Sequence, residues 1–299
     1  MPTNRDIYFQ LLNEDHKYLN KNIIISLLAD ASGYDDRMVL YANFDKEVKN
    51  PEHLFINIDL VKKGVPYQYV IGHTYFLGNK IVVNKDVLIP RQETEQLTVD
   101  TIVYIKKAFV DRNIPVIADV CTGSGAIACA IEKEIPNAKI YATDISLYAL
   151  KVAKKNVHNV ECLCGNLLQP LIDKKVKLDV LICNPPYIEN ISNIDKQVWD
   201  YEPHLALIAS PATKCYEEIF KDAHKVMKEH YLMAFEIEED MEKPLIELMN
   251  KYLVGCTYRF HKDMYDKTRF LYIIKYTRGE HMEVTWKTIL TSGKILVKP

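Results

Sequence analysis

Residues 116–131 read VIADVCTGSGAIACAI, and they indicate the fold class more directly than any other segment. Val116–Val120 is a short apolar run typical of a buried strand, and Ala126–Ile131 is expected to form a helix. Between them, Gly123 and Gly125 allow the backbone to turn sharply and to approach a ligand closely. The stretch therefore predicts a strand–turn–helix unit with a ligand-binding turn.

The same alternation continues downstream. Further strands are expected at Lys139–Thr143, Val160–Cys164, Leu178–Cys183, Tyr231–Glu236, Thr257–His261 and Phe270–Tyr276. Helical segments lie between most of them, including one near 216–227 and one over 244–252. This order predicts an α/β fold with a twisted, mostly parallel sheet and helices on both faces. Ligands are then expected at the carboxyl ends of the strands, where the strand order reverses.

The residues upstream follow a different pattern. Apolar residues between Arg5 and Gly64 recur at helical spacing, which indicates a small helical module. Tyr75–Val83 contains a Gly-Asn turn and predicts a hairpin, and Thr94–Val110 predicts a helix. We therefore expect four parts: a helical domain over 1–72, a hairpin linker over 73–92, the α/β domain over 93–276, and a tail over 277–299 without an obvious place in the sheet.

Composition and charge narrow the class of protein. The 299 residues include 38 Lys+Arg and 40 Asp+Glu, a net charge of −2, which argues against affinity based mainly on phosphate neutralisation. No apolar run reaches the roughly 18 residues of a membrane span, and the N-terminus lacks the apolar core of a secretory signal. Seven cysteines without a Cys-x-x-Cys pair favour reduced thiols and no metal site. We expect a soluble, cytoplasmic protein.

Two acids accompany the glycine turn. Asp119 lies in the strand before it, and Asp144 ends the next strand, where an acid can accept hydrogen bonds from ribose hydroxyls. No Gly-Lys-Ser/Thr follows the turn, which disfavours nucleoside triphosphates, and the full dinucleotide fingerprint is absent. The glycines alone would also fit a tight turn without a ligand. The order of strand, turn, helix, strand and acid favours a nucleotide-type ligand.

A second motif, Asn184-Pro185-Pro186-Tyr187, directly follows an apolar strand. The two prolines stiffen the backbone and remove two N–H donors. The Asn184 side-chain oxygen and the Pro185 carbonyl can then accept two hydrogen bonds from a planar NH₂ group, while the Tyr187 ring covers one face. A loop in which Asn184 only caps and Tyr187 only packs is the alternative. The position at a strand end favours binding.

Together these motifs resemble the S-adenosylmethionine site of class I methyltransferases. Asn-Pro-Pro-Tyr resembles the signature of those class I enzymes that methylate an amide or amino nitrogen. With Pro66–Gly72 and Leu88–Glu95, the chain resembles the HemK/PrmC family of release factor glutamine methyltransferases. The resemblance runs from the helical N-terminus to about Tyr276, and it implies a Rossmann-like, seven-stranded methyltransferase domain.

The resemblance also implies roles for individual residues. The residues expected to bind S-adenosylmethionine, and its product S-adenosylhomocysteine, are Asp119, Thr122, Gly123, Gly125, Asp144, Asn166 and Asn184. Asn184, Pro185 and Tyr187 are the expected catalytic residues, and they bind the substrate together with Pro186. Thr94 and Glu95 are further candidates to line the methionine end. Cys121 stands where many relatives carry Gly, and Asn166 stands where many carry an acid.

The implied reaction is transfer of the sulfonium methyl group to the side-chain N5 of a glutamine. The expected substrate is the Gly-Gly-Gln motif of class 1 peptide chain release factors, whose methylation modulates translation termination. The helical domain would recognise this protein substrate, and we expect a monomer with no membrane or nucleic-acid partner. An N6-adenine DNA or RNA methyltransferase presents the same donor geometry and stays an alternative, as does a ribosomal-protein glutamine methyltransferase.

Overall fold

The structure is a computed structural model that describes residues 2–108 and 114–275. Within them the chain divides into two compact units. One unit comprises the chain up to His73 together with Val83–Lys85 and Asp195–Glu202, and the other comprises the remainder. The expected tail and the predicted end of the helix at Val110 lie outside the described residues. None of the described helices is long and apolar enough to cross a membrane.

The first unit is helical, as the apolar spacing predicts. Its helices are α1 (Asn4–Leu12), α2 (Lys21–Ser32), α3 (Arg37–Ala42), α4 (Pro51–Lys62), α5 (Tyr67–Ile71) and α10 (Lys196–Tyr201). Side-chain caps start several of them: Thr3 forms a capping box with Asp6, and the Asn50 side chain accepts from the His53 N–H at the start of α4. Helix α2 is buried along most of its length and lies at the centre of the unit's apolar core.

Helix α10 belongs to the helical unit although it lies far along the chain. The Gln197 side chain donates to the Gly64 carbonyl at 2.9 Å, and the Tyr201 hydroxyl donates to the Lys63 carbonyl at 3.0 Å. The sequence did not predict this helix. Its six residues are too few for a helical period to be recognised.

The second unit contains a seven-stranded sheet in the order β5-β4-β3-β6-β7-β9-β8. The strands are β3 (Val116–Val120), β4 (Lys139–Asp144), β5 (Val160–Cys164), β6 (Leu178–Cys183), β7 (Met227–Glu236), β8 (Thr257–Lys262) and β9 (Thr268–Lys275). Strands β3 to β7 pair in parallel, and β9 runs antiparallel to both β7 and β8. A separate hairpin pairs β1 (His73–Phe76) with β2 (Asn79–Val82). The predicted α/β class and the predicted hairpin are confirmed.

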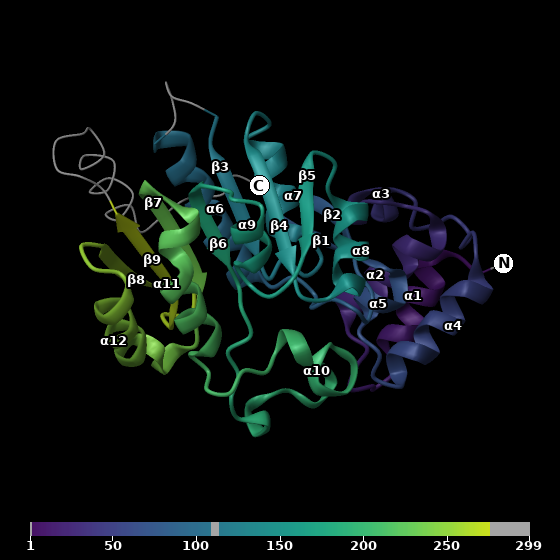
Figure 1. The fold of residues 1–299 in the computed structure, drawn as a ribbon. Helices are drawn as coiled ribbons and strands as arrows, with labels where there is room; N and C mark the ends of the chain where they lie inside the picture. The colour runs from purple at the N-terminus through teal and green to yellow at the C-terminus, as the bar shows by residue number, and fades with distance from the viewer. Residues whose placement is uncertain (1, 109–113, 276–299) are drawn as a thin grey trace. The chain divides into compact units, whose positions relative to one another are not determined.

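Helices cover both faces of the sheet (Figure 1). Because parallel crossovers are right-handed, the helices that follow β3 and β4 lie on one face, and those that follow β5 and β6 lie on the other. The first face carries α6 (Gln92–Ala108), α7 (Ala126–Glu134) and α8 (Leu147–Asn156), which pack against one another in that order. The second face carries α9 (Gln169–Asp173), α11 (Lys214–Val226) and α12 (Glu242–Tyr252).

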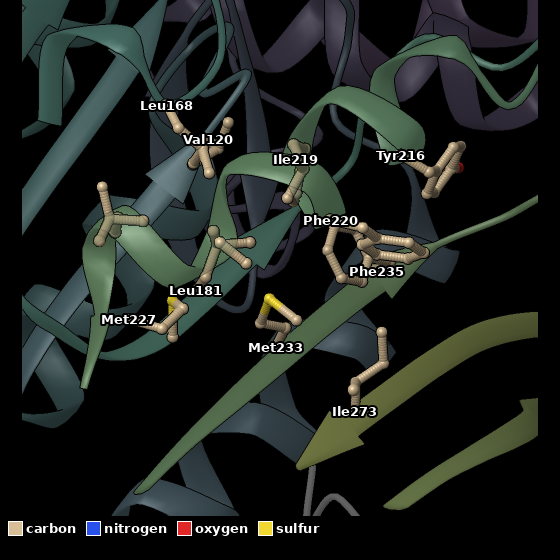
Figure 2. Close-up of a cluster of buried hydrophobic side chains, with 14 of the residues drawn as sticks. Val120, Leu168, Leu181, Tyr216, Ile219, Phe220, Met227, Met233, Phe235 and Ile273 are labelled. Carbon is tan, nitrogen blue, oxygen red and sulfur yellow. The ribbon is translucent and has the colours of Figure 1, made fainter. Parts of the chain in front are cut away.

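The apolar core beneath α11 holds that helix on β6 and β7. Figure 2 shows Ile219 and Phe220 of α11 beside Leu181 and Met233 of the sheet. The rings of Phe220 and Phe235 meet edge to face, with 5.5 Å between their centroids. This packing fixes the carboxyl ends of β6 and β7, from which the polar groups of the site project.

The predicted strands agree with the structure except at some ends. Strand β7 starts at Met227 rather than at Tyr231, because Met227 pairs with Leu178 across an irregularity in the ladder. The first residues of β7 include polar ones, so this part of the strand does not form an apolar run and was not predicted. One of them, Lys228, forms an ion pair with Asp179 at 2.6 Å. Helix α9, like α5, has five residues and was not predicted.

The strand order reverses between β3 and β6. From β3 the chain moves towards β4 and β5, and from β6 it moves towards β7. Val120 pairs with Cys183, so the two strands end at the same level. The glycine turn after β3 and the Asn-Pro-Pro-Tyr segment after β6 therefore start side by side, at the place where this fold class holds its ligands.

The two glycines of the turn provide a matched test of the packing. At Gly125 (φ +78°) an added Cβ would lie 3.1 Å from the Ala153 Cβ of α8, whereas at Gly123 (φ +54°) it would meet no atom of the described residues within 4 Å. A left-handed backbone costs an alanine roughly 1–2 kcal/mol, and overpacking adds roughly 1–3 kcal/mol. We expect Gly125→Ala to lower the free energy of unfolding by about 2–5 kcal/mol and Gly123→Ala by only about 1–2 kcal/mol. Urea denaturation of both variants measures this, and equal losses would contradict it.

Candidate functional site

A cavity of about 620 Å³ lies at the carboxyl ends of the strands in the second unit. Its walls come from the loops after β3, β4, β5 and β6, from the segment before α6, and from the start of α11. The residues from the two motifs and the neighbouring strand ends that line it are Cys121, Thr122, Gly123, Ser124, Asp144, Asn166, Asn184 and Pro186. The fold thus brings the glycine turn and the Asn-Pro-Pro-Tyr segment to one cavity.

The glycine turn is held by its neighbours in the sheet. The Thr122 N–H donates to the Thr143 carbonyl at 2.9 Å, and the Gly123 N–H donates to Asp144 Oδ2 at 2.9 Å. Gly123 leaves open space on the side where a Cβ would stand, so a ligand can approach its backbone. Cys121 has a φ of +60°, a conformation that favours glycine, which explains why a glycine suits this position.

Asp119 lies buried beneath the turn and is not among the residues that line the cavity. Its Oδ2 accepts from the Thr122 hydroxyl at 2.5 Å and from the Ala128 N–H at 3.2 Å. Its Oδ1 is buried and has no hydrogen-bond partner within residues 2–108 and 114–275. Burial raises the pKa of Asp119 to about 7. A buried acceptor without a donor is costly, so this oxygen is suited to a donor that a ligand supplies.

Asp144 lies at the end of β4 and lines the cavity. Besides the Gly123 N–H on Oδ2, it accepts the Ser146 N–H on Oδ1 at 2.8 Å. Burial raises the pKa of Asp144, although these backbone donors act in the opposite direction. The two N–H groups fix the carboxylate, and its remaining lone pairs can accept hydroxyl donors.

Asn166 and Glu218 meet at another wall of the cavity. The Asn166 Nδ2 donates to Glu218 Oε2 at 3.0 Å, and both residues line the cavity. The Asn166 Oδ1 is therefore the end of the amide that can accept a hydrogen bond from a ligand. Glu218 was missed by the sequence analysis, because an acid on an amphipathic helix such as α11 carries no signal of its own.

Asn184 is half-buried at the end of β6, and its side chain is tied to helix α6. The Asn184 Nδ2 donates to Thr94 Oγ1 at 3.1 Å, and Thr94 Oγ1 donates to Glu236 Oε2 at 2.7 Å. The Tyr187 hydroxyl donates to the other carboxylate oxygen, Glu236 Oε1, at 3.1 Å. Burial raises the pKa of Glu236, while the two hydroxyl donors and the nearby Arg269 guanidinium act to lower it.

Glu236 was also missed, although a signal for it exists. It ends an apolar strand of the parallel sheet, as Asp144 does, and the rule that selected Asp144 applies to it equally. Thr94 lines the cavity as expected, whereas Glu95 does not. The Glu95 Oε1 accepts instead from the Leu77 N–H in the hairpin turn at 2.7 Å.

The expected site residues fall into two groups. Thr122, Gly123, Asp144, Asn166, Asn184 and Pro186 line the cavity. Asp119, Gly125, Pro185 and Tyr187 are not among the lining residues. Asp119 lies beneath the turn, Gly125 packs against α8, and the Tyr187 hydroxyl is directed to buried Glu236.

The fold and the position of its cavity define a class I methyltransferase. Residues 104–201 match the family model described as "Methyltransferase small domain". A release factor glutamine methyltransferase from Mycoplasma mycoides subsp. mycoides is 35% identical over 272 residues, which are 85% of this chain and 93% of that protein. The protein of the same name from Bacillus subtilis is 34% identical over 71% of this chain and 76% of its own length. The chain belongs to the release factor glutamine methyltransferase family.

A solved structure supports the fold alone. The chain is similar to the structure titled "Crystal structure of hMettl16 catalytic domain in complex with MAT2A 3'UTR hairpin 1" with a TM-score of 0.51 and 17% sequence identity. The match covers 67% of this chain and 76% of that chain.

The raised pKa of Asp119 predicts how stability depends on pH. The folded state holds the proton up to about pH 7, whereas the ordinary pKa is 3.8. Between these values the unfolded chain has lost a proton that the folded protein keeps, so stability falls as the pH rises, by about 1.4 kcal/mol per pH unit. In Asp119→Asn the side chain is a neutral isostere that does not titrate, so this loss of stability with rising pH should be absent. Chemical denaturation from pH 4 to 8 should show the variant gaining stability over the wild type as pH rises, and a constant difference would contradict it.

Proposed function

We propose that this protein transfers a methyl group from S-adenosylmethionine to the side-chain amide N5 of the glutamine in the Gly-Gly-Gln motif of class 1 release factors, and so modulates translation termination in the cytoplasm. The observation that carries the proposal is the orientation of the half-buried Asn184 amide. Its Nδ2 donates to Thr94, so its Oδ1 can accept a hydrogen bond from a ligand in the cavity. The names of the relatives support the substrate.

The residues around the cavity fit the proposed cofactor. Asp119 lies beneath the turn rather than in the cavity wall, and its Oδ1, which has no hydrogen-bond partner among the described residues, is the group that we assign to the methionine ammonium in a charge-assisted hydrogen bond. The Asp144 carboxylate can accept the ribose hydroxyls, and the Asn166 Oδ1 can accept from the adenine amino group. The open space at Gly123 leaves room for the cofactor to pass over the turn. When bound, S-adenosylmethionine supplies an electrophilic methyl group on a positively charged sulfur.

The Asn-Pro-Pro-Tyr segment prepares the acceptor. An amide nitrogen is a poor nucleophile because its lone pair is delocalised into the carbonyl. Asn184 Oδ1 and the Pro185 carbonyl can accept its two N–H hydrogens and direct the lone pair at the methyl carbon. Orientation and preorganised electrostatics of this kind lower a barrier by several kcal/mol. As the nitrogen takes the methyl group, the positive charge passes from the sulfonium, which leaves as a neutral thioether, to the amide, and the amide then releases one N–H proton. Because this proton leaves after the new bond forms, no carboxylate or histidine has to remove it first.

We propose that the helical unit recognises the release factor. The hairpin serves as the linker that leads from it to the α/β domain. Large apolar side chains are exposed on three helices of the helical unit: Phe9 on α1, Met38 on α3 and Ile56 on α4 are 51%, 71% and 61% exposed. Exposed apolar groups of this size suit a protein partner better than a nucleic acid.

Transfer of labelled methyl groups tests the proposed substrate. The protein is incubated with labelled S-adenosylmethionine and, in separate reactions, a class 1 release factor, ribosomal proteins, DNA or RNA. We expect label on the release factor, located by mass spectrometry on the glutamine of Gly-Gly-Gln. A release factor with that glutamine changed to alanine is the control. Label on nucleic acid or on ribosomal proteins alone would refute the proposed substrate.

Two variants separate the acceptor site from the cofactor site. Asn184→Ala should leave the Kd for S-adenosylmethionine within about threefold of the wild type and lower kcat roughly 100-fold or more, because the lost interaction acts chiefly in the transition state. Asp144→Ala should raise that Kd roughly tenfold or more, because it removes charged acceptors for the ribose. Calorimetric titration and single-turnover kinetics measure both quantities. The reverse pattern would show that the two sites are exchanged.

A further inference from the structure

A polar network lies behind the acceptor site. Asn184 contacts Thr94, Thr94 contacts Glu236, and Glu236 contacts Tyr187, all through side chains. Thr94 and Glu236 are buried, and their contacts are not part of a backbone ladder. We infer that Thr94 and Glu236 are positioning residues that set the direction in which the Asn184 amide faces. This inference rests on the proposed function, in which Asn184 Oδ1 holds the acceptor amide.

The donors and acceptors of the network allow one arrangement. A carboxylate has no proton and can only accept, and a threonine hydroxyl has a single proton to donate. Thr94 therefore donates its proton to Glu236 Oε2, and only its lone pairs remain for Asn184. Asn184 must present Nδ2 to Thr94, which leaves Oδ1 for the cavity that Asn184 lines.

The opposite orientation of the amide would block the proposed reaction. With Oδ1 turned to Thr94, the Asn184 NH₂ group would face the NH₂ group of the acceptor amide, and two donors cannot bind each other. Without a carboxylate at position 236, the Thr94 hydroxyl would be free to donate to Asn184 Oδ1 and to stabilise this orientation. Through Thr94, the buried acid at position 236 thus decides which atom of the Asn184 amide the substrate meets.

The same carboxylate also fixes the far end of the segment. Its Oε1 accepts from the Tyr187 hydroxyl, while its Oε2 holds Asn184 through Thr94. Pro185 and Pro186 stiffen the backbone between these two anchors. Strand pairing places Glu236 there, because Cys183, which precedes Asn184, pairs with Phe235. One side chain of β7 therefore holds both ends of the acceptor segment.

Thr94→Val tests the inference, since valine keeps the branched shape and removes the hydroxyl. We expect kcat for methyl transfer to the release factor to fall roughly 10- to 100-fold, the range that applies when a partner that orients a metal ligand is removed. The Kd for S-adenosylmethionine should stay within about twofold, because the loss lies in the transition state. Thr94→Ser restores the hydroxyl and should return kcat to within about threefold of the wild type.

Thr101→Val is the matched control. Thr101 is another buried threonine of α6, but its hydroxyl donates to the Leu97 carbonyl at 2.8 Å and is not part of the network. It should lose stability but keep the wild-type kcat. The inference is overturned if Thr94→Val transfers methyl groups at the wild-type rate, or if it loses activity because its Kd for S-adenosylmethionine rises. It is also overturned if kcat of Thr94→Ser falls as far as that of Thr94→Val. If Asn184→Ala itself transfers normally, the proposed function fails instead.

Discussion

The shared level at which β3 and β6 end is the constraint on which the site depends. Val120 and Cys183 are paired, and the chain leaves these two strands towards opposite edges of the sheet. The crossover helices then lie on opposite faces, and a gap remains above the strand ends. The glycine turn and the Asn-Pro-Pro-Tyr segment must open into this gap, although they are distant in the sequence. A change in the strand order would separate the two motifs without changing either of them.

Burial of acids around the cavity comes at a cost in stability. Burial raises the pKa of Asp119, Asp144 and Glu236, so each carboxylate is less stable in the folded protein than in water. Asp144 and Glu236 offset part of this cost with two hydrogen-bond donors each. One oxygen of Asp119 accepts from no donor in the part of the chain that the structure describes. A buried acceptor without a donor lowers stability, which is common where a group serves function rather than stability.

Two asparagines on different walls of the cavity are oriented in the same way: a protein acceptor holds the NH₂ group of each side-chain amide. The Asn166 NH₂ group is tied to Glu218, and the Asn184 NH₂ group is tied to Thr94. In both, an acid lies behind the amide, directly or through a hydroxyl, and leaves the oxygen for the ligand. The cavity is therefore rich in acceptors, and it suits ligands that are recognised by their N–H and O–H groups.

The sequence alone determined the sheet strands, the helical N-terminal unit, the glycine turn and the Asn-Pro-Pro-Tyr segment. Each of these is encoded locally, by an apolar run, a helical period, or glycine and proline with their own backbone preferences. Three features follow from folding instead: Thr94 and Glu236 lie behind Asn184, Glu218 contacts Asn166, and α10 joins the helical unit. These contacts join side chains from separate elements, and the apolar periodicity of the sequence does not indicate which elements become neighbours. The motifs follow from short-range preferences of the chain, whereas the orientation of each amide follows from partners that only folding brings within reach.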